Sequence, residues 1–113
     1  MSSTIQVVDV KDAEVYEDAT VVSRRVVRKA HGSQGMSFNV TTLKDGYHDA
    51  AVTYPDHDEI VYVLSGTVEL TIAGQARVVG PGTAFFVPRG QTYGYKVLSG
   101  PNEVIAAFTP ARF

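Results

Sequence analysis

Apolar and polar residues alternate along this chain with the short period of β-strands rather than the longer period of helices. Short apolar runs, rich in valine, threonine and aromatic residues, are separated by turns that contain glycine or proline. Such runs are typical of strands whose successive side chains point to opposite faces of a sheet. The pattern predicts about nine strands, at 20–29, 36–43, 47–54, 59–64, 67–73, 75–79, 83–87, 93–98 and 103–109.

Turn residues fall between these runs at regular intervals, at 65–66, 74, 80–82, 88–90 and 99–101. Many short strands with regular turns indicate an all-β sandwich or barrel. Helical periodicity is weak, and 10–17 is the stretch where a short helical turn is expected.

The length bounds the domain organisation. A chain of 113 residues has the size of one domain, and its 44% apolar residues are enough to form a core. We expect a single domain over 1–113, with a barrel core at about 36–109 and N-terminal strands in 1–35.

Charge and composition exclude several classes of function. The net charge of −2 gives no electrostatic reason to bind nucleic acid. The basic residues Arg24, Arg25, Arg28 and Lys29 are interpreted as a solvated face. The chain has no cysteine, no basic and apolar leader at its start, and no apolar run long enough to cross a bilayer. We therefore expect a cytoplasmic protein without membrane contact.

Two segments have a characteristic spacing. Gly46 is followed by five residues, then 52–54, four residues, Glu59, six residues and Gly66. Gly82 is followed by five residues, then 88–90, two residues, Tyr93, three residues and a valine. These segments resemble the two signature motifs of the cupin superfamily, in its small, single-domain, RmlC-like form. The resemblance implies a cupin barrel, which is a jelly roll or double-stranded β-helix.

The resemblance also implies where metal ligands stand in such barrels: two histidines and a glutamate in the first motif, and one histidine in the second. This chain keeps the glutamate, Glu59, but has Val52, Tyr54 and Tyr93 at the histidine positions. One carboxylate with tyrosines is a poor site for a divalent metal. We expect no metal cofactor; the alternative is Fe, Mn, Ni or Zn held by Glu59, His48 and His57.

Strand alternation extends the candidate site. If positions 52 and 54 face inward, so does His48; if Glu59 and Tyr93 face inward, so do Val61 and Tyr95, and His57 lies near the rim. The predicted catalytic residues are Glu59, His48, Tyr54, His57 and Tyr93. The predicted substrate-binding residues are Tyr95, Phe38, Val61 and Phe86.

Two cupin types are more similar in their local sequence. The segments 58–60, 63–66 and 110–113 resemble the ethanolamine-utilisation type. The segments 36–41, 57–62 and 108–110 resemble ectoine synthase, which closes a ring with loss of water. In that family the glutamate that matches Glu59 helps to hold iron, but its other ligand positions carry phenylalanine (Phe85 or Phe86) and Tyr93 here.

Burial of Glu59 is expected to raise its pKa and suit it to general acid/base catalysis. A structural carboxylate capped by Tyr54 or Tyr93 is the alternative. Three functions stay open: a lyase or isomerase that catalyses dehydration, cyclisation or enolisation beside a carbonyl, a metal-dependent enzyme, and a non-catalytic binding protein. The expected partners are a small-molecule substrate and a second copy of the chain, which would cover the edge of strand 20–29.

Overall fold

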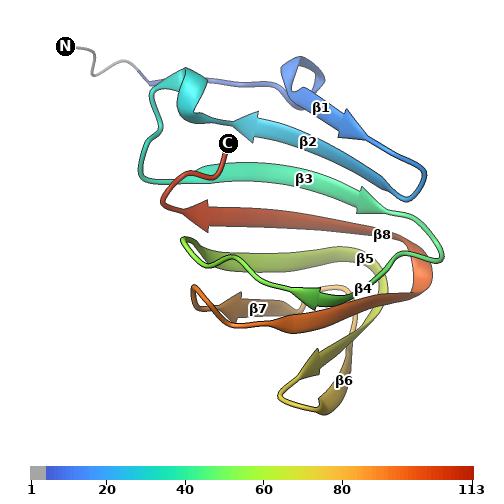
Figure 1. The fold of residues 1–113 in the computed structure, drawn as a ribbon. Helices are drawn as coiled ribbons and strands as arrows, with labels where there is room; N and C mark the ends of the chain where they lie inside the picture. The colour runs from blue at the N-terminus through green and yellow to red at the C-terminus, as the bar shows by residue number, and fades with distance from the viewer. Residues whose placement is uncertain (1–4) are drawn as a thin grey trace.

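A computed structural model describes residues 5–113 and shows one antiparallel sheet of eight strands that curls over its own core (Figure 1). The all-β class is thereby confirmed. Two short 3-10 helices, η1 (Val10–Asp12) and η2 (Lys29–His31), flank the first strands. No helix within residues 5–113 has the length and apolar character needed to span a membrane. The strands are β1 (Glu14–Glu17), β2 (Val21–Val27), β3 (Ser37–Leu43), β4 (His48–Val52), β5 (Asp58–Ile72), β6 (Gln75–Val79), β7 (Ala84–Val87) and β8 (Tyr93–Thr109).

Two long strands organise the barrel. The sheet order is β1-β2-β3-β8-β5-β6, and β4 pairs with β8 while β7 pairs with β5. The second half of β8 pairs with β3 and with the first half of β5, whereas its first half pairs with β4 and the second half of β5. Each long strand therefore pairs with different neighbours along its two halves and connects the two parts of the barrel.

The predicted breaks at 65–66 and 99–101 are bends inside β5 and β8 rather than strand ends. The β5–β8 register shifts at Val63, Ser65 and Thr67, which shows where the two strands turn together. Gly66 sits at this bend with φ +80°, and a Cβ there would lie 2.6 Å from the carbonyl oxygen of Ser99. The bend joins two pairs of predicted strands, which reduces nine to seven, and β1 adds a strand that the sequence did not predict, so the structure has eight.

The N-terminal region differs from its prediction in two ways. The expected helical turn in 10–17 is confined to η1, and the rest of that segment forms β1. β1 pairs along β2, so β2 lies between β1 and β3 and has no free edge. The expectation that strand 20–29 offers an edge to a second copy is therefore wrong, because β1 already occupies that edge.

Inward-facing residues divide the core into an apolar and a polar part. On β5 and β8 most inward residues are apolar, as Val63 and Val104 illustrate. On β3 the alternate buried residues are Ser37, Asn39 and Thr41, followed by Leu43. Polar residues of β3 therefore line the core beside the apolar residues of the paired strand β8.

The bend generates a stability prediction. Gly66→Ala combines a left-handed backbone with a clash against backbone atoms, so it should lower the free energy of unfolding by about 3 kcal/mol or more. Gly74→Ala is the matched control, because Gly74 has φ +79° and open space around its Cβ position; its cost should be about 1 kcal/mol. Urea unfolding measures both, and equal losses would show that the bend tolerates a side chain.

Candidate active site

A cavity of about 200 Å³ lies inside the barrel, at the end where β5 begins and β8 finishes. Its walls come from β2, β3, β5 and β8, together with residues beside β4 and the segment that follows β8. The lining residues are Tyr16, Val21, Ser23, Arg25, Asn39, Thr41, Leu43, Tyr47, Val52, Tyr54, Glu59, Val61, Tyr93, Tyr95, Val104, Ala106, Phe108, Arg112 and Phe113.

Glu59 is the carboxyl group in this wall. It lies near the start of β5, where alternation turns it inward between the paired residues Phe108 of β8 and Val87 of β7. Glu59 is 5% exposed to solvent. The Tyr93 hydroxyl, from the start of β8, donates a hydrogen bond to Glu59 Oε1 at 2.8 Å. The structure thus brings together Glu59 and Tyr93, two of the three titratable residues at the ligand positions of the motifs.

Burial sets the protonation of this pair. Removal from water raises the pKa of Glu59, and the hydrogen bond from Tyr93 and the charge of Arg112 oppose that rise. The pKa of Tyr93 is raised far above its ordinary value, chiefly by burial and then by the charge of Glu59. Tyr93 therefore stays protonated as a donor, while Glu59 is shifted toward the range in which a carboxyl group exchanges protons near neutral pH.

The second inward tyrosine of β8 has a structural partner. The Tyr95 hydroxyl donates to Asn102 Oδ1, and Asn102 Nδ2 donates to the backbone oxygen of Ser65 at 2.8 Å. Burial raises the pKa of Tyr95 above its ordinary value. Tyr95 therefore lines the cavity with its ring while its hydroxyl helps to fix the bend.

The segment after β8 folds across the mouth of the cavity. Arg112 N donates to Ser37 Oγ at 2.9 Å, and Lys29 N donates to the backbone oxygen of Phe113 at 2.7 Å. Arg112 Nη1 donates to the Tyr54 hydroxyl at 3.4 Å, and its guanidinium carbon lies 4.5 Å from the Tyr54 ring centroid. Burial raises the pKa of Tyr54 and Arg112 partly offsets the rise, so the phenol stays protonated.

The polar wall of β2 and β3 forms a short chain of hydrogen bonds. Asn39 Nδ2 donates to Thr41 Oγ1 at 2.9 Å, and Thr41 donates to Ser23 Oγ at 3.4 Å. All three residues are buried and line the cavity. This wall offers hydroxyl and amide groups to a ligand, and β8 separates it from the Glu59 strand β5 in the sheet.

The prediction that His48 faces the cavity is wrong. His48 is exposed on β4, and so are Asp49, Ala50 and Ala51. The β4–β8 register shifts between Asp49 and Val52, so alternation from position 52 back to 48 is broken by a bulge. Val52 and Tyr54 line the cavity, whereas His48 does not.

Phe38 and Phe86 are also outside the cavity, contrary to the prediction. Phe38 alternates with the buried Ser37 and Asn39 and so points to the outer face of β3. Phe86 is 60% exposed, and its neighbour Phe85 turns inward, with its ring centroid 6.0 Å from that of Tyr93. Of the predicted substrate-binding residues, the structure places Val61 and Tyr95 in the cavity wall.

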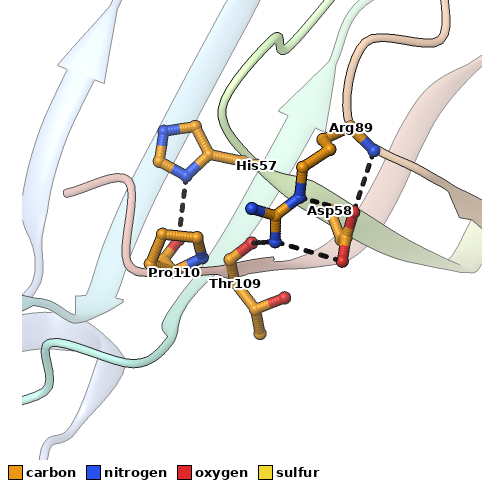
Figure 2. Close-up of polar contacts among 5 residues, drawn as sticks. All are labelled: His57, Asp58, Arg89, Thr109 and Pro110. Carbon is orange, nitrogen blue, oxygen red and sulfur yellow. Dashed lines mark hydrogen bonds and ion pairs between the residues drawn. The ribbon is translucent and has the colours of Figure 1, made fainter.

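His57 lies at the rim rather than among the lining residues. Its Nδ1 donates to the backbone oxygen of Pro110 at 2.9 Å (Figure 2). Its ring also meets the Phe108 ring edge-on, with the ring centroids 6.1 Å apart. This position suits a residue that fixes the segment after β8. Proton transfer to a substrate in the cavity would require His57 to move.

An exposed ion pair braces the same end of the barrel. Arg89 donates through its backbone nitrogen at 2.8 Å and through Nε at 3.2 Å to Asp58 Oδ1, and its Nη2 reaches the Thr109 oxygen at 3.4 Å (Figure 2). The hydrogen bonds from Arg89 hold the pKa of Asp58 below its usual value. Three chain segments are thus tied together one residue from Glu59.

The residues present do not fit the metal site of a cupin. Within residues 5–113, His, Cys, Asp and Glu form no group of three that can hold a metal ion. The alternative set of Glu59, His48 and His57 is not brought together, because His48 is exposed on β4. The former histidine positions carry a valine and two phenols whose pKa values are raised, and a protonated phenol is a weak ligand.

Sequence reasoning missed the arginines and the polar wall. Alternation along 36–43 places Asn39 and Thr41 on the same face as Ser37, and this signal was present in the sequence. Arg25 was interpreted as part of a solvated face, yet it lines the cavity. Arg112 follows the last strand, where no periodic pattern indicates the direction of a side chain.

Comparison with known sequences identifies relatives of the whole chain and of half of it. The chain is 33% identical over 101 residues to a pyrimidine/purine nucleoside phosphorylase of Geobacter sulfurreducens, covering 88% of this chain and 90% of that protein. It is 32% identical over 56 residues to the pectin degradation protein KdgF of Dickeya dadantii, and this match spans about half of each protein, 50% and 51%.

Solved structures share the fold at lower identity. KdgF from Halomonas sp. has a TM-score of 0.82 at 21% identity, with 95% of this chain and 96% of that chain covered. Ectoine synthase from P. lautus has a TM-score of 0.84 at 22% identity, with 95% and 79% covered. The family profile described as "Cupin domain" (Cupin_2) matches residues 39–108. The predicted cupin fold is confirmed, and the chain belongs to the cupin domain family.

Proposed function

We propose that this cupin is a small-molecule enzyme of the lyase or isomerase type, in which Glu59 moves a proton beside a carbonyl group. The observation that carries the proposal is a carboxyl group buried in a cavity wall and hydrogen-bonded to Tyr93. Dehydration, cyclisation and enolisation all begin or end with such a proton transfer.

The geometry suits a general acid/base. In the described part of the chain, Glu59 is hydrogen-bonded through Oε1, which leaves Oε2 for a substrate proton. Its raised pKa brings the acid and base forms closer in free energy at neutral pH, which favours transfer in both directions. Tyr93 fixes the orientation of the carboxyl group, as a positioning residue does.

Tyr54 is suited to hold the carbonyl oxygen. Its phenol stays protonated because its pKa is raised, and Arg112 at 3.4 Å adds positive charge beside it. A donor near a cation stabilises negative charge that develops on a carbonyl oxygen during enolisation.

Related proteins support this class of reaction. Ectoine synthase and the polyketide cyclase RemF of Streptomyces resistomycificus share the fold, with TM-scores of 0.84 and 0.77. The names of these two proteins describe a synthase and a cyclase. The iron site that the resemblance to ectoine synthase implies does not transfer, since the ligand positions of this chain hold Val52, Tyr54 and Tyr93.

Nucleoside phosphorolysis is a second candidate function. The relative from Geobacter sulfurreducens is matched over 90% of its length and is named as a nucleoside phosphorylase. Arg25 and Arg112 line the cavity and have the chemistry to bind phosphate. In that case Glu59 would donate a proton to the departing base.

The proposed role of Glu59 predicts that the protein catalyses proton exchange. Incubation of the protein in D2O with a panel of small 2-oxo and 3-oxo acids should replace the protons next to the carbonyl with deuterium faster than buffer does, as measured by proton NMR. Glu59→Gln should slow this exchange by about a hundredfold or more, because general-base catalysis contributes a factor of that order. Glu69→Gln is the matched control, since Glu69 lies on the same strand and faces outward. Full exchange by Glu59→Gln would contradict the proposal.

Tyr93→Phe should change the pH dependence of the same exchange. The hydrogen bond from Tyr93 lowers the pKa of Glu59, so its loss raises that pKa further. The base form of Glu59 then appears at higher pH, and the rising limb of the exchange rate should move in that direction. A limb that moves to lower pH, or does not move, would rule out Glu59 as the group that titrates.

The second candidate has its own assay. Incubation with inosine or uridine and inorganic phosphate should release the free base, as measured by liquid chromatography, if the chain is a phosphorylase. Release that depends on phosphate and is lost in Arg112→Gln would favour phosphorolysis over carbonyl chemistry. Absence of release with both nucleosides would remove this candidate.

A further inference from the structure

Two arginines reach the cavity at its mouth and contact one aromatic ring. The guanidinium carbon of Arg25 lies 4.0 Å from the Phe113 ring centroid, and that of Arg112 lies 4.6 Å from it. Both arginines line the cavity. The Phe113 ring thus holds two guanidinium groups beside the same opening, although their like charges repel each other.

The charges that line the cavity do not balance. Arg25 and Arg112 carry two positive charges, and Glu59 is the acidic residue in the wall. Burial raises the pKa of Glu59, which reduces the negative charge available. Glu14 lies 3.7 Å from Arg25, but none of the ion pairs formed within residues 5–113 includes Arg112. The cavity mouth is therefore positive in a chain whose net charge is −2.

Hydrogen-bonding capacity in the same wall is also unfilled. Among the described residues, Arg25 Nε and Asn39 Oδ1 are buried without a hydrogen-bond partner. The two residues face each other in the register of β2 and β3, and Asn39 is 6% exposed. Each unfilled polar atom costs about 1–3 kcal/mol. Such a cost is typical of a wall that a ligand or its bound water completes.

We propose that Arg25 and Arg112 form an oxyanion subsite at the cavity mouth, which binds the carboxylate or phosphate group of the substrate. Guanidinium groups bind both oxyanions through paired hydrogen bonds. The bound anion would neutralise the two cations, and its reacting carbon would extend inward toward Glu59. The subsite rests on the proposal above that this cavity binds the substrate, but it does not depend on the role of Glu59.

Binding of simple anions tests the subsite. Sodium pyruvate, sodium malonate and inorganic phosphate are titrated into the wild-type protein by calorimetry, with acetone as the uncharged counterpart of pyruvate. Arg112→Gln should weaken anion binding by about tenfold to a hundredfold, because it removes charge-assisted hydrogen bonds to the anion. Arg77→Gln is the matched control, because this substitution removes the same charge from a residue that is exposed on β6 and lies outside the cavity.

The outcomes separate the possible ligands and the two proposals. Binding of the organic acids without phosphate, or of phosphate without the acids, identifies the group that the subsite takes. Equal affinity in wild type and Arg112→Gln, or equal affinity for acetone and pyruvate, would overturn the subsite. Glu59→Gln should bind the anions at least as tightly as wild type, so loss of proton exchange in that variant leaves the subsite intact. Arg25→Gln provides a second test if Arg112→Gln does not fold.

A different observation concerns the outer face of the sheet. Strand register places five apolar residues in one row across β7, β5, β8, β3 and β2. The row consists of Phe86, Ile60, Ala107, Phe38 and Val27.

The next row contains Ala84, Tyr62, Ile105 and Val40, and ends at Arg24. Charged side chains are thus absent from both rows until the β2 end of the described sheet.

The exposed apolar area of this outer face indicates what covers it. Phe86 is 60% exposed, Ile60 53%, Tyr62 42% and Leu64 41%. Together these four residues expose on the order of 400 Å² of surface, which is within the range of the largest apolar patches on monomers. Two copies facing each other would bury about 800 Å² of apolar surface, close to the apolar share of a standard homodimer interface.

We infer that a second copy of the chain packs on this face, with the two-fold axis near Ile60 and Tyr62. A patch that is apolar at its centre and has Arg24 at one end can pair with itself, as a two-fold interface requires. The dimer predicted from the sequence is retained, but by pairing of sheet faces instead of strand edges.

Analytical ultracentrifugation at micromolar concentration tests the dimer. Wild type should sediment as a dimer, and Ile60→Lys should sediment as a monomer, because two lysines would face each other near the axis. Val78→Lys is the control, since Val78 is 58% exposed on β6, outside the two rows. Circular dichroism confirms that the variants fold. A monomeric wild type, or a dimer that persists in both Ile60→Lys and Phe86→Lys, would overturn the inference.

Discussion

The hydrogen bond from Tyr93 to Glu59 is the interaction on which the site depends. A carboxyl group in an apolar wall is costly to ionise, and Tyr93 at 2.8 Å recovers part of that cost without adding charge. The bond also ties the start of β8 to the start of β5, which are neighbours in neither sequence nor strand register. Closure of the barrel therefore buries Glu59, which raises its pKa, and also forms the bond that limits this rise, so fold and chemistry are coupled.

The segment after β8 adds a second constraint. Arg112 and Phe113 are held by backbone bonds to η2 and β3, and their side chains stack on Tyr54, Phe108 and Arg25. The cation at the mouth therefore depends on a segment without regular secondary structure. Arg112 acts on the site in two ways, since it lowers the pKa of Glu59 and donates to Tyr54. A change in this segment should alter the cavity without disturbing the barrel.

The sequence predicted the parts of this site that strand alternation and turn spacing determine. Glu59 and Val61 face inward because β5 is regular there, and Tyr93 and Tyr95 face inward for the same reason on β8. The prediction that His48 faces inward was wrong because a bulge in β4 reverses the alternation, and a bulge has no clear signature in one sequence. Arg112 lies beyond the last strand, where its direction depends on tertiary contacts.

The exchange of histidine for tyrosine changes the chemistry that the barrel supports. An imidazole offers a lone pair to a metal at neutral pH, whereas a buried phenol with a raised pKa offers a proton. In a metal-binding cupin, Glu59 would be one of four metal ligands. In this barrel it is a carboxyl group whose raised pKa suits it to accept and release a proton. The two arginines supply positive charge at the mouth, where the proposed oxyanion subsite lies. A cupin barrel with this wall is consequently better suited to moving protons on an anionic substrate than to holding a divalent cation.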